Sequence, residues 1–96
     1  MLEDGTLILN EMAPRPHNSG HWTMEGCDQS QFDLAISALV GEDLRPPVQL
    51  SPRAIMTNLL GEDILTPRLG PQTFWHDYGK ASPKPGRKMG HVTVLG

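Results

Sequence analysis

The sequence predicts a small α+β fold with one short helix, three short strands and many irregular connections. Three observations support this class. Apolar residues recur at helical spacing over residues 30–40, while residues 53–60 and 89–95 have the composition of strands. Ten glycines and nine prolines among 96 residues exclude long uninterrupted helices.

The first expected element is a strand at Thr6–Met12. This run is rich in β-forming residues and follows residues 3–5, Glu-Asp-Gly, which have hairpin-turn chemistry. Only Met1 and Leu2 precede that turn, and two residues cannot pair with a seven-residue strand. The strand would keep an open apolar edge, which natural domains avoid, so we expect an incomplete fold whose chain starts inside a larger one.

A helix is expected from about Ser30 to Val40. Ser30 and Asp33 can form a capping box at its start, and Gly41 is suited to end it. Its apolar residues at helical spacing are Phe32, Ile36, Leu39 and Val40.

The rest of the chain is expected to be loop-rich β structure. Residues 42–52 contain three of the prolines and form a connection, Arg53–Leu60 forms a strand and Gly61 closes it. After that point short apolar pieces alternate with proline and glycine, among them Pro67. The last piece, Met89–Leu95, has alternating valines and is the third expected strand.

Composition excludes several classes of protein. No apolar run reaches the ~20 residues that a bilayer crossing needs, and the first residues lack the basic and apolar regions of a signal peptide. The single Cys27 cannot form an intrachain disulfide or a thiolate zinc cluster, which is typical of a reducing compartment. We expect a cytoplasmic protein that does not associate with membranes.

Charge is distributed unevenly along the chain. Residues 1–79 carry all eleven acidic residues and four arginines, a net charge of −7, whereas residues 80–96 carry four basic residues and no acidic one, a net charge of +4. This basic tail should attract an anion. Because the whole chain is acidic and poor in aromatics, we expect a small phosphate-bearing ligand and no nucleic acid. A solvated basic edge strand is the structural alternative.

Polar residues suited to metal and phosphate chemistry gather in residues 10–23. Asn10 and Glu11 place an amide and a carboxylate at the end of the expected strand, and Arg15 and His17 follow in a loop that prolines restrict. A carboxylate is a hard oxygen ligand for Mg²⁺. Each residue taken singly also has a structural explanation: a solvated carboxylate, an ion pair between Arg15 and Glu11, or a hydrogen-bonded loop histidine.

Four motifs in one order resemble a known family. They are Asn10–Thr23, Ser30–Phe32, Asn58–Gly61, and Tyr78–Lys80 followed by Pro85–Thr93. Together they resemble the C-terminal part of the 5-(carboxyamino)imidazole ribonucleotide synthases, the ATP-grasp enzymes of bacterial and fungal purine biosynthesis that are also called the ATPase subunit of phosphoribosylaminoimidazole carboxylase. The resemblance runs from about Leu2 to Gly96, and four motifs in order are far more specific than one.

The resemblance implies an ATP-dependent carbon–nitrogen ligase. Such an enzyme converts bicarbonate to carboxyphosphate with ATP and Mg²⁺, then transfers the carboxyl group to the amine of 5-aminoimidazole ribonucleotide. It implies the C-terminal end of an ATP-grasp domain at residues 1–45, with strand, catalytic loop and helix. Residues 46–96 would form a small β-rich C-terminal domain similar to a rudimentary hybrid motif, and the intact enzyme would be a homodimer.

The resemblance also implies roles for seven residues. Asn10 and Glu11 match the pair that contacts ATP, and Glu11 matches one of two Mg²⁺-binding glutamates. The loop around bicarbonate and carboxyphosphate is matched by Arg15, His17 and Asn18. Lys80 and Arg87 match residues near the ribonucleotide and its phosphate.

The chain lacks several parts of that family. The second metal-binding glutamate, the Rossmann-like N-terminal domain and the lysine-bearing strands that hold the nucleotide have no counterpart in these 96 residues, and the family continues beyond a glycine like Gly96. We therefore expect a fragment, about the last quarter of the enzyme, that is inactive alone. Residues 62–77 resemble the family less than the rest.

Two alternatives remain open. The formate-dependent glycinamide ribonucleotide transformylases share the Pro-Arg-Pro-His loop and the Ser-Gln-Phe motif, although residues 18–23 and 88–91 are closer to the carboxylating family. A different class is a non-catalytic binding module, in which the basic tail holds a phosphorylated ligand and Glu11 is only a polar strand end.

Overall fold

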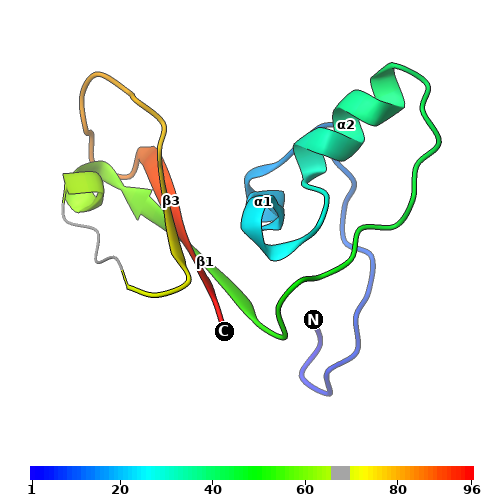
Figure 1. Cartoon of the computed structure of the whole chain (residues 1–96). Helices are drawn as coiled ribbons and strands as arrows, with labels where there is room; N and C mark the ends of the chain where they lie inside the picture. Colours follow the sequence, from blue (N-terminus) through cyan, green and yellow to red (C-terminus); the bar gives the residue numbers. More distant parts are fainter. Residues whose placement is uncertain (66–69) are drawn as a thin grey trace.

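The computed structural model describes residues 1–65 and 70–96. Its elements in chain order are η1 (Asn18–Gly20), α1 (Thr23–Gly26), α2 (Gln31–Leu39), β1 (Ala54–Leu60), η2 (Gly61–Leu65), β2 (Thr73–Asp77) and β3 (Lys88–Leu95). The α-helices belong to the first half of the chain and the sheet to the second, which confirms the α+β class (Figure 1). The expected loop around Pro67 lies outside the described residues.

The three strands form one antiparallel sheet in the order β1-β3-β2. The strands predicted at Arg53–Leu60 and Met89–Leu95 correspond to β1 and β3, each within one residue of the expected bounds. The central strand β3 pairs with β1 along most of its length. On its other edge β3 pairs with β2, where His91 lies opposite His76. The small apolar core lies here and consists of Leu59, Ile64 and Met89, with Val92 packed against it.

Helix α2 begins and ends as the sequence predicts. The Ser30 hydroxyl accepts a hydrogen bond from the Asp33 N–H at 3.1 Å, and the Asp33 carboxylate accepts one from the Ser30 N–H at 2.8 Å. Gly41, just beyond the helix, has φ of +78°, a left-handed conformation that glycine adopts at little cost. The apolar side of the helix stays open, since Leu39 is 81% exposed.

The strand expected at Thr6–Met12 is wrong for this structure, although the turn before it forms. The Leu2 N–H donates to the Thr6 carbonyl at 2.9 Å, and the Asp4 carboxylate accepts from the Thr6 N–H at 2.8 Å. Residues 6–12 then run extended without a β ladder, because no described segment lies alongside to pair with them. Leu9 is consequently 85% exposed.

Residues 42–52 form the expected connection between α2 and β1. An isolated bridge between Cys27 and Gln49 ties this connection to the end of α1, and the Arg45 guanidinium pairs with the Asp28 carboxylate at 2.7 Å. Within the described ranges, no helix has the length and apolar character that a membrane crossing requires.

Candidate functional site

The residues predicted to contact ATP lie in the open extended segment. Asn10 and Glu11 are exposed, and their side chains form no hydrogen bond or ion pair within residues 1–65 and 70–96. The same part of the chain holds no cluster of three histidine, cysteine or acidic residues able to bind a metal ion. The Glu11 carboxylate is the right type of donor for Mg²⁺, but it fits only as one ligand of a larger set.

Side chains from two other elements hold His17 and Asn18. Gln31, the first residue of α2, accepts the His17 N–H on Oε1 at 2.9 Å and donates from Nε2 to the His17 carbonyl at 2.8 Å. Asn18 donates from Nδ2 to Oδ1 of Asn58 on β1 at 2.9 Å. The loop is therefore attached to both a helix and the sheet.

Arg15 lies in the same loop but keeps its charge accessible. Its guanidinium is exposed and donates one hydrogen bond, to the Pro16 carbonyl at 3.1 Å. The ion pair with Glu11 that the sequence left open is absent from the described residues. Arg15 borders an open pocket of about 570 Å³ between the loop and α2, so most of its N–H donors can meet an anion.

The basic tail contains the turn that its prolines and glycine predict. The Arg87 N–H donates to the Lys84 carbonyl at 3.0 Å, and Gly86 has φ of +74°, as the third position of a type II turn requires. The Lys80 ammonium donates to the carbonyl of Lys88, the residue that follows Arg87, and lies 5.7 Å from the centre of the Tyr78 ring. The turn thus places the carbonyl of Lys88, the neighbour of Arg87, within hydrogen-bonding distance of the Lys80 ammonium.

Three imidazoles between the first half of the chain and the sheet form a group that the sequence did not predict. The ring centres of His76 and His91 are 4.6 Å apart and those of His21 and His91 5.2 Å, in stacked orientations. The Tyr78 hydroxyl bonds to His91 Nδ1 at 2.8 Å. These four residues line a pocket of about 200 Å³. No short motif in the sequence marks this group, because His76 and His91 become neighbours only through the pairing of β2 with β3.

Burial determines the charge of this histidine group. Removal from water, with help from the nearby His76 and His21, lowers the pKa of His91 to about 4. His91 Nε2 is buried with no hydrogen-bond partner in the described part of the chain. Burial also lowers the pKa of His21, and its neighbour His76 instead bonds to the Glu25 carboxylate of α1. His91 is therefore neutral at physiological pH.

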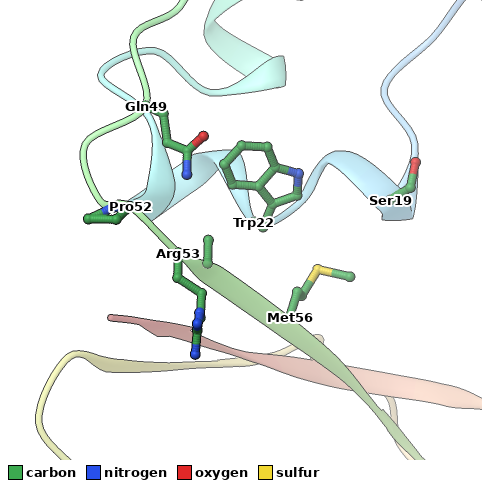
Figure 2. Close-up of a pocket in the computed structure, with 7 residues that line it drawn as sticks. Ser19, Trp22, Gln49, Pro52, Arg53 and Met56 are labelled. Carbon is green, nitrogen blue, oxygen red and sulfur yellow. The ribbon is translucent and has the colours of Figure 1, made fainter. Parts of the chain in front are cut away.

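Another open pocket, of about 540 Å³, lies between the helical half of the chain and the start of β1. Figure 2 shows the Trp22 indole and the Gln49 amide on one side, with Arg53 and Met56 on the other. None of the seven predicted site residues lines it, so the candidate site is the loop and the basic tail rather than this pocket.

Comparison with known proteins assigns both halves of the chain. Residues 1–32 match the ATP-grasp domain, and residues 54–96 match the phosphoribosylaminoimidazole carboxylase C-terminal domain. The N5-carboxyaminoimidazole ribonucleotide synthase of Staphylococcus haemolyticus is 46% identical over 97 residues, which is 97% of this chain and 26% of that protein.

Solved structures give the same result. The crystal structure of N5-carboxyaminoimidazole synthetase from Staphylococcus aureus has a TM-score of 0.82 at 46% identity, over 98% of this chain and 27% of that one. The Aspergillus clavatus N5-carboxyaminoimidazole synthase, solved in complex with ADP and 5-aminoimidazole ribonucleotide, has a TM-score of 0.74 at 38% identity, over 99% and 28%.

The chain thus joins the end of an ATP-grasp domain to a carboxylase C-terminal domain, which defines its class. It belongs to the N5-carboxyaminoimidazole ribonucleotide synthase family and corresponds to the C-terminal part of its members. It spans about a quarter of the length of the curated relatives it matches. The family indicated by the four sequence motifs is confirmed, and the matches support it over the formate-dependent transformylases.

Proposed function

We propose that this chain is the C-terminal part of a ligase that uses ATP and bicarbonate to carboxylate the amine of 5-aminoimidazole ribonucleotide through carboxyphosphate. One observation carries the proposal. The loop with His17 and Asn18 is attached to α2 and β1 by side-chain hydrogen bonds, while the Arg15 guanidinium beside it stays open to an anion. The relatives are named N5-carboxyaminoimidazole ribonucleotide synthases, and one similar structure was solved with ADP and 5-aminoimidazole ribonucleotide.

The loop residues suit a planar one-carbon anion. The Arg15 guanidinium offers forked N–H donors that match the two oxygens of a carboxylate or of carboxyphosphate. The His17 imidazole can donate or relay a proton beside it, and the Asn18 amide can hold a further oxygen. Catalysis of this kind depends on holding the reacting groups in place and stabilising charge, so a fixed loop is what it needs.

Asn10 and Glu11 are proposed to face the nucleotide. Bound Mg²⁺ supplies neutralisation of the phosphate charge, and Glu11 would hold it with its carboxylate while Asn10 contacts ATP. The described residues offer this one carboxylate at that position, so other ligands must complete the set.

Lys80 and Arg87 are proposed to bind the phosphate of the ribonucleotide. Both cations border one turn, and charge-assisted hydrogen bonds to a phosphate are roughly twice as strong as neutral ones. A cytoplasmic location, a homodimer of the intact enzyme and a domain boundary between residues 45 and 46 stay predictions that rest on the sequence and the family resemblance.

The test compares the 96-residue chain with a full-length enzyme that carries these residues in place of the matching quarter of the Staphylococcus aureus relative. The full-length enzyme should release phosphate from ATP when bicarbonate is present and carboxylate 5-aminoimidazole ribonucleotide when it is added. The chain alone should do neither, because most of the groups that stabilise the transferred phosphoryl group lie outside it.

Glu11→Gln makes this test specific, since it keeps the side-chain shape and removes the charge. In the full-length enzyme, kcat should fall by at least about 10²-fold, as when one electrostatic contact to the transition state is lost. Near-normal turnover at saturating Mg²⁺ would leave Glu11 a structural role only. Bicarbonate-dependent phosphate release by the chain alone, faster than by its own Glu11→Gln variant, would contradict the expected inactivity.

A further inference from the structure

The Gln31 carboxamide uses nearly all of its hydrogen-bonding capacity on one loop. Oε1 accepts the His17 N–H at 2.9 Å, and Nε2 donates to the His17 carbonyl at 2.8 Å. Nε2 also lies 2.8 Å from His21 Nδ1. An amide nitrogen carries two N–H donors and accepts none, so His21 must accept on Nδ1 and carry its proton on Nε2. Gln31 thus contacts both histidines of the loop at once.

The two bonds to His17 restrict its orientation. They engage the N–H and the carbonyl of the same residue, as a neighbouring strand does in an antiparallel sheet. A residue held at both groups cannot rotate about its backbone without breaking one of them, so the direction of its side chain is limited as well. The ring is held further by the Ser19 hydroxyl, 3.0 Å from His17 Nδ1.

The surrounding backbone is shaped to admit this amide. A Cβ at position 20 would lie 2.5 Å from Gln31 Oε1, so the glycine there leaves the space that the carboxamide occupies. The Thr23 hydroxyl accepts the Gln31 N–H at 2.9 Å and donates to the Gly20 carbonyl at 2.6 Å. Both ends of Gln31 are therefore fixed to the loop it holds.

A second side chain holds the adjacent loop residue from the sheet. Asn58 lies on β1 opposite His91 of central β3, and its Oδ1 accepts from Asn18 Nδ2 at 2.9 Å. Asn18 and Asn58 are half-buried, and forty positions separate them in the sequence. The bond sets the distance between the loop and the three-stranded sheet.

We propose that Gln31 and Asn58 are positioning residues that orient His17 and Asn18 toward the one-carbon substrate. The inference rests on the proposed function of the loop and adds two residues that act through it. Because loss of these bonds would displace the loop rather than remove a substrate contact, the kinetics of bicarbonate should change while those of ATP should not. A misplacement of about 1 Å can cost on the order of 10²-fold in rate.

Gln31 is tested by Gln31→Ala in the full-length enzyme that carries residues 1–96. We expect kcat/KM for bicarbonate to fall by at least about 10-fold, with KM for ATP within about twofold of the parent. Gln29→Ala is the matched control, because the Gln29 amide donates to the Arg45 carbonyl at 3.3 Å, away from this loop. Equal effects of the two variants, or an equal loss for ATP and bicarbonate, would overturn the inference.

Asn58 allows a test by conservative replacement. Asn58→Leu removes the acceptor for Asn18 at similar volume, whereas Asn58→Asp keeps an oxygen at the same place. Bicarbonate kcat/KM should fall by about 5- to 10-fold in the leucine variant, and the aspartate variant should recover most of that loss. A loss of the same size in both would show that the hydrogen bond is not what matters.

A double variant separates this inference from the proposed function. If Gln31 acts through His17, Gln31→Ala should reduce bicarbonate kcat/KM by less than about twofold in a His17→Ala background. A His17→Ala enzyme with unchanged bicarbonate kinetics would refute the proposed function, and the inference with it. A large loss in His17→Ala with none in Gln31→Ala would refute only the inference. In the 96-residue chain, Gln31→Ala should also speed hydrogen exchange at the His17 amide, and unchanged exchange would count against it.

Discussion

The two halves of the chain are held by different kinds of interaction. In residues 54–96 a backbone ladder joins three strands, and Met89 is buried to 2% exposure in the core between them and η2. In the first half, side chains replace the ladder: Gln31 holds His17, and Ser30 caps α2. Apolar residues there, such as Leu9 at 85%, stay exposed.

This difference shows where binding residues can be placed. Ladders on both edges pair the backbone groups of the central strand β3 and leave little freedom, whereas a loop held by a few side chains can present its remaining groups to a ligand. Six of the seven predicted site residues lie outside regular structure, and the seventh, Asn18, begins the short helix η1. The sheet serves them as a rigid support.

The largest effect on stability should come from the sheet half. Met89→Ala removes a side chain that is almost fully buried, and we expect the free energy of unfolding to fall by about 2–5 kcal/mol. Leu9→Ala, at a position that is mostly exposed, should change it by less than about 0.5 kcal/mol. Urea unfolding of the 96-residue chain measures both, and equal losses would abolish the contrast between the halves.

Acid should weaken the contact between the halves through His91. Its pKa in the folded chain is about 4, below the ~6.5 of an unfolded histidine, so the unfolded state binds the proton more readily. The stability that the neutral ring contributes is complete above pH 6.5 and is lost as the pH falls toward 4. The free energy of unfolding should fall by about 3 kcal/mol in all, since one pKa unit corresponds to about 1.4 kcal/mol and the pKa of His91 is lowered from 6.5 to about 4.

This pH dependence is measured by unfolding at pH 7 and pH 4, and by an NMR titration of the His91 ring. His91→Gln is the control variant, in which this part of the dependence should disappear. Titration of His91 near pH 6.5 in the folded chain would contradict its burial between His76, His21 and Tyr78.

The basic turn of the sheet half should affect substrate binding but not stability. In the full-length enzyme, Lys80→Ala and Arg87→Ala should each lower kcat/KM for 5-aminoimidazole ribonucleotide by about 10- to 150-fold, the range expected when a hydrogen bond to a charged group is lost. Lys84→Ala, at an exposed position of the same turn, should change it little. Equal, small and salt-sensitive effects at all three positions would indicate diffuse attraction instead.

The smallest effect should be local to the first half. Ser30→Ala removes the hydroxyl of the capping box at the start of α2 and should cost about 1 kcal/mol in the free energy of unfolding. Ser37→Ala, within the same helix, should be neutral or slightly stabilising because alanine has the higher helix propensity. Far-UV circular dichroism during urea unfolding distinguishes the two, and equal values would show that the cap contributes nothing.

Local elements were predicted well because their determinants lie close together in the sequence. The α2 capping box needs two residues three positions apart, and the turn before Arg87 needs one proline and one glycine. The strand at Thr6–Met12 failed for the opposite reason. Its composition is that of a strand, but a strand also needs a partner, and no described segment provides one.

The sequence by itself determined the family, through four ordered motifs, and the helix, turns and two strands of the fold. Only the tertiary structure decided which groups meet. Gln31 and His17 are 14 positions apart, Asn18 and Asn58 are 40, and Glu25 and His76 are 51. Contacts at such separations depend on chain entropy, strand register and the packing of whole elements, so no local pattern of residues encodes them. The supports of the candidate site became visible for this reason only after the chain was folded.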